Sequence, residues 1–467
     1  MLLTGGKMYR RSHISRHAAR VVSAIVLLFT LCPFALAGTG AIGLQSPANA
    51  SAASGIVRKV FGTNKASHKR TPTPTATPQP TSTPTPTPTP TATVAPTPTA
   101  GATPITTTLV IYGQNGTTYS GLRISTTSGD CIDIINSTNV TIKNSNIGPC
   151  GTNNSLSAGN GIYISGGSGN NIYDNYIHVE NLASGCCDTH DGILIGSGST
   201  NDTVQGNVIA YGETNVETQS AGNVTITGNF LLNPRGPFPR GQQVQAALST
   251  NITVSGNYTL GSLDTATYSY PEQIEDSISF WCDGSHTCTG YTVEGNYVTG
   301  GHSTSGCGIN CDQNVQSCSF LDNVLYNTAQ CGINISDGTN QLVSGNKILE
   351  DENPMVAGGD TALVVWNEYP TYACGPVQVR NNISTFVRTD GYASGYWNGG
   401  GCEPVTCDGS NPNVDSCNIF DYGSGRDAYN LLIADPAVTN PPLVPPGPKN
   451  CVAKSPYSTQ TSLPACQ

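Results

Sequence analysis

The sequence predicts an all-β protein, a single-stranded parallel β-helix (solenoid) that follows a disordered Thr/Pro linker. Three observations predict it: the composition, a recurring strand-turn unit, and a nearly fixed spacing inside that unit. Glycine accounts for 53 of 467 residues, while only 11% of residues are charged and 7% are aromatic. Such a composition is typical of short strands joined by many turns.

The first 104 residues carry an export signal and a spacer. We read residues 1–37 as a signal peptide, because basic residues precede a short apolar run and a small-residue cleavage site. An uncleaved membrane anchor is the alternative. Residues 38–70 form a basic disordered segment, and residues 71–104 alternate Thr and Pro, which predicts an extended spacer. We expect a secreted or cell-surface protein with no stable membrane span after signal cleavage.

The charge is strongly asymmetric. Ten of the twenty Lys and Arg residues lie before residue 71, whereas all thirty Asp and Glu residues lie after it. A body this acidic argues against nucleic acid as a partner. We expect a monomer whose partner is a polysaccharide substrate or ligand.

A repeat extends over residues 105–435. A short strand begins at residues 131, 161, 192, 215, 243, 277, 308, 332 and 362, and an asparagine follows, in most units after fourteen or fifteen residues. These anchor asparagines are Asn175, Asn207, Asn229, Asn257, Asn296, Asn323, Asn346 and Asn382, with Ser145 in the first clear copy.

The repeat has a direct physical interpretation. Each unit is one coil with two or three strands, and each strand pairs in parallel with its copy in the next coil. Asparagine tolerates the left-handed corner conformation, and stacked asparagines form a hydrogen-bonded ladder. Segments of variable length are loops at one edge, where function usually resides. Asn-x-Thr triplets at Asn139, Asn223 and Asn251 follow from the repeat, with glycosylation as the alternative.

These strand and Gly-Asn repeats resemble the right-handed parallel β-helix of the pectate-lyase-like superfamily. The resemblance and the general crossover preference imply the right-handed form. The resemblance also implies a polysaccharide cleft along one strand face and under its loops.

Sixteen cysteines remain after the signal peptide, which in an oxidising compartment predicts disulfides. Cys307 and Cys331 occupy one column of successive coils, so we expect them to be bonded or stacked. Cys282 and Cys288 flank a short loop that they can close. The Cys/Pro-rich C-terminal tail, residues 436–467, is expected to cover the last coil together with the preceding cysteines.

The candidate ridge comprises the strands that begin at residues 192, 215, 243 and 277, and polar residues take the outward positions on the last three. The outward positions there are Asn215 and Glu217, Gln243 and Gln245, then Ser277 and Ser279. We predict that this ridge binds substrate, with simple solvation as the alternative. The preceding loops add Glu213 and Glu275.

The segment 233–245 presents Arg235 and Arg240 on a Pro- and Gly-rich loop. A guanidinium recognises a carboxylate in bidentate fashion, which predicts binding of an acidic sugar. The alternative is pairing with Glu213, Glu217 or Glu275.

His190 is the predicted general base, because its pKa lies nearest neutrality. The run Asp188-Thr189-His190-Asp191 resembles the Asp-Pro-His motif of β-helical mannuronan epimerases and alginate lyases, with Thr in place of Pro. That resemblance implies proton transfer by His190, with Asp188 in the same centre. The clustered carboxylates give Ca²⁺ as an alternative occupant.

The sequence thus predicts a secreted polysaccharide lyase acting on a uronic-acid-containing glycan. The predicted catalytic residues are His190, Asp188, Arg240 and Glu217. A glycoside hydrolase of the same fold is one alternative, with Glu217 paired with Glu275 or Asp276. A non-catalytic adhesin or glycan-binding protein is the other.

Overall fold

The computed structural model describes residues 104–152, 159–179, 190–236, 241–261, 275–301, 305–328, 330–351, 361–388, 390–423, 425–440 and 442. Contacts divide the chain into Met1–Thr83 and Pro84–Gln467, and every described residue belongs to the second unit. The predicted signal peptide and basic segment lie outside the described residues. So do all but one residue of the linker and most of the C-terminal tail.

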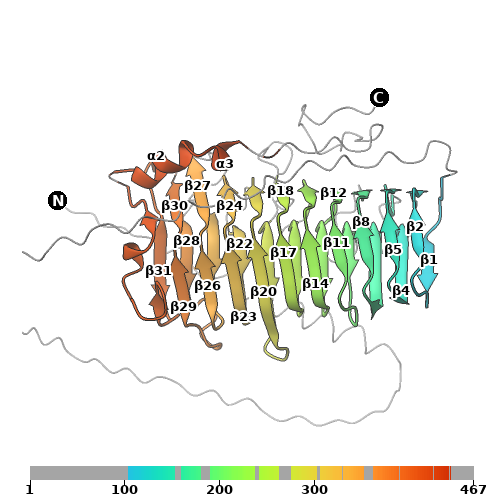
Figure 1. Cartoon of the computed structure of the whole chain (residues 1–467), viewed down its shortest axis with the longest axis horizontal. Helices are drawn as coiled ribbons and strands as arrows, with labels where there is room; N and C mark the ends of the chain where they lie inside the picture. The colour runs from blue at the N-terminus through green and yellow to red at the C-terminus, as the bar shows by residue number, and fades with distance from the viewer. Residues whose placement is uncertain are drawn as a thin grey trace, which may run out of the picture. The chain divides into compact units, whose positions relative to one another are not determined.

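The described strands form three parallel sheets of eleven strands each. Consecutive strands of the chain enter the three sheets in turn, so each coil contributes one strand to each sheet (Figure 1). This confirms the predicted parallel β-helix, with three strands per coil.

The strand bounds are as follows. The first sheet contains β1(Leu109–Tyr112), β4(Ile132–Thr138), β7(Ile162–Ser168), β10(Ile193–Ile195), β13(Val216–Gln219), β16(Val244–Ala247), β19(Ile278–Trp281), β22(Cys307–Cys311), β25(Cys331–Ile335), β28(Thr361–Trp366) and β31(Tyr396–Gly400). The second contains β2(Thr118–Ser120), β5(Thr141–Lys143), β8(Asn171–Tyr173), β11(Thr203–Gln205), β14(Gly222–Thr227), β17(Thr250–Ser255), β20(Cys288–Glu294), β23(Val315–Leu321), β26(Gln341–Ser344), β29(Val377–Arg380) and β32(Val405–Thr406). The third contains β3(Arg123–Ile124), β6(Asn146–Ile147), β9(Tyr176–His178), β12(Val208–Ala210), β15(Phe230–Leu232), β18(Tyr258–Leu260), β21(Tyr297–Thr299), β24(Val324–Tyr326), β27(Lys347–Asp351), β30(Ile383–Val387) and β33(Ile419–Phe420).

The nine first strands expected from the repeat begin within one residue of β4 through β28. The repeat did not predict two further coils, which contain β1 and β31. Beyond β33, helices α2(Asp427–Ile433) and α3(Pro436–Thr439) pack against β24, β27 and β30 of the third sheet. The last coil itself contains Cys402, Cys407 and Cys417, which were expected to lie in a covering tail.

Alternation of side chains along the strands produces one continuous core. In the first sheet Ile193, Val216, Val244 and Ile278 align in register and are fully buried. Burying one such side chain contributes roughly 1.5–3 kcal/mol. The positions between them face outward, and they form the wall on which the candidate site lies.

The anchor asparagines form the predicted ladder. The side-chain amide of each anchor donates to the carboxamide oxygen of the next at 2.9–3.0 Å, through Asn175, Asn207, Asn229, Asn257, Asn296, Asn323, Asn346, Asn382 and finally Asn418. Each oxygen also accepts the backbone N–H of the preceding anchor, as Asn257 does from Asn229. The ladder therefore joins neighbouring coils by both backbone and side chain.

The left-handed corner, however, lies one residue earlier than expected. The residue before each anchor has a positive φ, for example Asn144 at 55°, Gly206 at 66° and Gly256 at 59°. Glycine and asparagine are the residues that adopt this conformation at least cost. The recurrent Gly-Asn pair thus combines a left-handed corner with a ladder amide.

Six disulfides bind every cysteine in the described ranges. Cys282–Cys288 closes a short loop, and Cys307–Cys331 joins successive coils with the Cα atoms 4.5 Å apart. The others are Cys131–Cys150, Cys311–Cys318, Cys374–Cys402 and Cys407–Cys417.

Replacing Asn257 by alanine tests the ladder. The change leaves two N–H donors of Asn229 and the carbonyl of Ile226 without the Asn257 side chain, whereas Asn296 Oδ1 keeps the backbone N–H of residue 257. Because each unmet buried group costs about 1–3 kcal/mol, we expect the free energy of unfolding to fall by at least ~3 kcal/mol in urea titrations. Gln205→Ala, on the exposed face of β11, should change it by less than ~0.5 kcal/mol. Equal effects in the two variants would contradict the role of the ladder.

Candidate functional site

A column of five polar residues runs along the outer face of the first sheet. Parallel pairing aligns Glu217, Gln245, Ser279, Asn310 and Asn334 on consecutive strands from β13 to β25. We call this column the polar ladder. Its members are buried, with 1–9% of their surface exposed.

Hydrogen bonds link the C-terminal half of the polar ladder. Asn334 donates through Nδ2 to Asn310 Oδ1 at 3.2 Å and to Ser336 Oγ at 2.7 Å. Asn310 donates in turn to Asp276 Oδ2 at 3.2 Å. The amides are thereby held in fixed orientations along several coils.

Several sequence-predicted residues meet at the N-terminal end of the polar ladder. His190 and Glu213 are fully buried, and His190 Nδ1 lies 4.0 Å from Glu213 Oε2. Arg235 is only 7% exposed, and its Nη1 donates to the carbonyl of Gly236 at 3.1 Å. Backbone bonds stack the three segments, since Glu213 N donates to His190 O and Gly236 N to Glu213 O.

Other predicted residues have structural partners. Asn215 and Gln243 are fully buried, and Asn215 Nδ2 donates to Gln243 Oε1 at 2.7 Å and to the carbonyl of Leu232 at 3.1 Å. Both belong to the corner between the first and third sheets. Their part in substrate binding stays a prediction, as does that of half-buried Glu275. Asp188 and Arg240 lie outside the described residues.

One column of aspartates is structural. Asp130, Asp191 and Asp276 each accept a backbone N–H of the following coil through Oδ1, at 2.7, 3.0 and 2.7 Å. Asp191, which ends the run around His190, therefore serves the pairing of coils. The remaining oxygen of Asp276 is the one that Asn310 reaches.

Four carboxyl groups gather at the C-terminal end of the polar ladder. Asp276 precedes β19, while Asp312, Asp337 and Glu368 follow β22, β25 and β28. We call them the acidic cluster. In the described part of the chain, no salt bridge involves any of the four.

The segment after β28 folds back over the cluster and positions two of its members. Tyr369 Oη donates to Asp312 Oδ1 at 3.0 Å, and Tyr372 Oη accepts from Gln313 Nε2 at 3.1 Å. Glu368 N donates to Ser336 O at 2.7 Å. The disulfide from Cys374 to the next coil anchors the far end of this segment.

Burial dominates the electrostatics of the cluster. It raises the pKa of Glu368 and of Asp337 each to about 7, and nearby carboxylates add to the rise. Burial also lifts the pKa of Asp312 well above its usual range, and the charges of Asp276 and Glu368 add to that rise. The carboxyls of the cluster therefore keep their protons to a higher pH than free carboxyls do. A raised pKa of this kind suits a general acid that works near neutral pH.

Metal binding has no support from the described residues. Across those ranges, no group of three His, Cys, Asp or Glu side chains is placed to hold a metal ion. The Ca²⁺ alternative rested on the run around Asp188, which lies outside the described residues.

Sequence reasoning missed Asp312, Asp337 and Glu368. A usable signal existed, because an acidic residue comes one or two positions after three consecutive first-sheet strands, in Cys311-Asp312, Ser336-Asp337 and Trp366-Asn367-Glu368. Parallel stacking places the ends of such strands along one edge.

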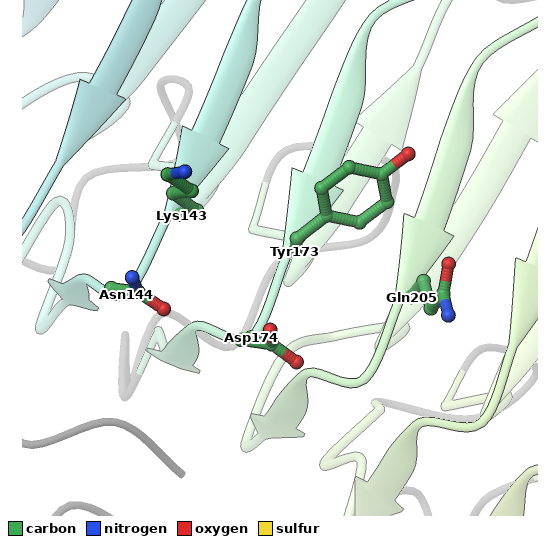
Figure 2. A pocket seen from close by; sticks show the side chains of 5 residues that line it. All are labelled: Lys143, Asn144, Tyr173, Asp174 and Gln205. Atoms are coloured by element: carbon green, nitrogen blue, oxygen red, sulfur yellow. The ribbon is translucent and has the colours of Figure 1, made fainter.

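A separate hollow of about 370 Å³ lies on the second sheet. Figure 2 shows Tyr173 between Lys143 and Gln205, with Asn144 and Asp174 at the turn beneath them. Burial raises the pKa of Asp174, and the charge of Lys143 lowers it. With a single carboxyl among its lining residues, this hollow lacks an acid–base pair.

Comparisons with known proteins give only distant similarities. No family model and no curated protein matches the chain. Among solved structures, the Streptococcus pneumoniae surface adhesin PfbA is 17% identical with a TM-score of 0.46, covering 63% of this chain and 74% of its own. DFA-IIIase from Arthrobacter chlorophenolicus A6 in complex with GF2 is 14% identical with a TM-score of 0.43, covering 67% and 87%. The Dettilon tailspike protein is 14% identical with a TM-score of 0.35, covering 56% and 60%. Similarities this distant assign neither a family nor an activity.

The acidic cluster makes stability depend on pH in an unusual direction. Its carboxyls have folded-state pKa values near 7 for Glu368 and Asp337, above their unfolded values of about 4. The folded state then binds more protons, so its extra stability is full below the unfolded pKa and is lost as the pH rises through the folded one. We expect the thermal midpoint to fall between about pH 5 and pH 8.

Two variants test this source of the pH dependence. Asp312→Asn combined with Glu368→Gln should make the fall in midpoint smaller, whereas Glu294→Gln, at an exposed site on β20, should leave it unchanged. If the thermal midpoint of the double variant fell with pH as steeply as that of the wild type, the result would contradict this explanation. Calorimetry across the pH range measures it.

Proposed function

We propose that the protein is an exported glycoside hydrolase that cleaves a polysaccharide at the acidic cluster. One observation carries the proposal: Asp312 and Glu368, both partly exposed and both with raised pKa values, stand beside a column of ordered amides. Buried carboxyls that lack a cationic partner are costly, and perturbed acids of this kind gather at functional sites.

The proposed chemistry uses two carboxyls in different protonation states. Asp312, kept protonated, gives its proton to the glycosidic oxygen as the C–O bond breaks. Glu368, ionised, takes a proton from the water that adds to the anomeric carbon. Tyr369 orients Asp312 through the hydrogen bond from its hydroxyl, and the bonded amides of Asn310 and Asn334 support the strands beneath.

The lyase hypothesis has weaker geometric support. Elimination needs a base at C5 and a cation on the uronate carboxylate. His190, however, is fully buried beside Glu213, and the guanidinium of Arg235 is turned toward the carbonyl of Gly236. Lyase action, uronic acid recognition and membership of the pectate-lyase-like superfamily remain predictions.

The proposed export is supported by the disulfides. Every cysteine in the described ranges is bonded, as is usual in oxidising compartments. Over the same ranges, neither helix has the length and hydrophobicity to cross a bilayer.

Hydrolysis is tested by incubating the full chain with neutral and uronic-acid polysaccharides and following new reducing ends. We expect reducing ends without unsaturated-product absorbance. Glu368→Gln and Asp312→Asn should each reduce the rate at least about a hundredfold, because general acid–base groups contribute that much.

Matched controls separate catalysis from charge. Glu294→Gln and Asp322→Asn remove one exposed carboxylate each on the second-sheet side, and asparagine suits the positive φ of Asp322. Both should keep the wild-type rate. Glycan binding with neither product would establish the adhesin alternative instead.

The lyase hypothesis has its own decisive result. The wild type would release unsaturated products from a uronan, with or without Ca²⁺. Elimination would be favoured over hydrolysis if these products disappeared in His190→Ala and Arg240→Ala but persisted in Glu368→Gln. We expect none of this absorbance.

A further inference from the structure

The outward column that carries the polar ladder ends on aromatic residues. Parallel pairing aligns Asn334 with Val364 and Val364 with Trp397, on β25, β28 and β31. Trp366 lies at the end of β28, two residues before Glu368 of the acidic cluster. Polar amides therefore give way to an apolar surface beside the proposed catalytic carboxyls.

The two tryptophans form a defined surface. Their ring centroids are 5.8 Å apart at an interplanar angle of 49°. Trp366 packs against the buried cluster that contains Val364, Cys307 and Cys331, which gives it a firm base. Trp397 keeps 48% of its surface exposed. We call this pair the tryptophan platform.

A glycine keeps the platform in place. A Cβ added at Gly399 would lie 2.6 Å from Trp366 Cβ and 2.7 Å from the ring of Trp397. Real Cβ atoms do not approach other atoms this closely, so a larger residue would displace one of the rings. The local chain thus favours the present arrangement of the rings.

The charge around the platform restricts its occupant. In the described part of the chain, the polar ladder and acidic cluster present amides, hydroxyls and carboxyls, no salt bridge involves the cluster, and Arg235 stands at the opposite end of the ladder. Those carboxyls that are ionised repel an anionic ligand, whereas an uncharged ligand meets no such repulsion. An aromatic face paired with amides suits a ring that has one apolar face and many hydroxyls.

We propose that the tryptophan platform binds a neutral sugar ring by stacking, and so selects uncharged polysaccharides over uronic-acid ones. The inference rests on the proposed hydrolysis at the acidic cluster and names its substrate class. The glycan has one ring on the exposed Trp397 and its scissile bond at Asp312 and Glu368, the partly exposed carboxyls of the acidic cluster.

Binding is measured apart from cleavage in the Glu368→Gln full chain. The probes are dextran, galactomannan and arabinan as neutral polymers, and polygalacturonate and alginate as anionic ones. Tryptophan fluorescence and affinity electrophoresis report binding. We expect at least one neutral polymer to bind and both anionic polymers to fail.

Substitutions locate the contact. Trp397→Ala and Trp366→Ala should each weaken binding by about tenfold or more, as expected for truncation of an aromatic anchor. Tyr112→Ala removes a 66% exposed ring at the opposite end of the first sheet and should bind as the parent does. Since Trp366 also packs against a buried cluster, the exposed Trp397 is the decisive position.

Three results would contradict the role of the platform. Trp397→Ala could bind with wild-type affinity, or no neutral polymer could bind at all. Sedimentation could also show that the parent chain is a dimer and that Trp397→Ala is a monomer. The last would make the platform a contact between two copies. Hydrolysis by the wild type with unchanged affinity in Trp397→Ala would refute the platform alone. Binding lost in Trp397→Ala, with no cleavage by the wild type, would refute the hydrolysis alone.

Discussion

The asparagine ladder is the interaction on which the rest of the structure depends. Each rung satisfies buried backbone and side-chain groups of two coils at once, so the register between coils is fixed rung by rung. A slip of one residue would turn the apolar positions outward and break the ladder simultaneously. The left-handed residue that precedes each rung up to Asn382, such as Gly256, brings the chain round the corner at the same point in successive coils.

Because the register is fixed, residues at equivalent positions of successive coils lie side by side on the surface of the sheet. Because every coil repeats the same outward positions, one polar substitution per coil becomes a continuous line, as from Glu217 to Asn334. Loops of variable length then differ from coil to coil without disturbing the core. The acidic cluster depends on this arrangement. Asp312 follows β22, and Glu368 belongs to the segment after β28, which turns back so that Tyr369 donates to Asp312.

The fold was predictable because its signal is repeated many times, whereas the site was only partly so. The strand starts, the asparagine ladder and the disulfide between Cys307 and Cys331 all follow from one alignment of coils. The alignment could not reveal that the segment after β28 turns back, placing Tyr369 on a carboxyl 57 residues earlier. Nor could it show that His190 would be enclosed, because burial depends on loops whose lengths do not repeat. The sequence therefore directed attention to the N-terminal half of the polar ladder, and the carboxyls lie beside the other half.

Three features lie along the first sheet: the polar ladder, the acidic cluster and the tryptophan platform. The most direct test is a crystal structure of the Glu368→Gln variant with a bound neutral oligosaccharide. The account predicts a sugar ring stacked on Trp397 and a glycosidic oxygen within hydrogen-bond reach of Asp312. A glycan bound instead in the hollow around Tyr173, with the first sheet unoccupied, would contradict it.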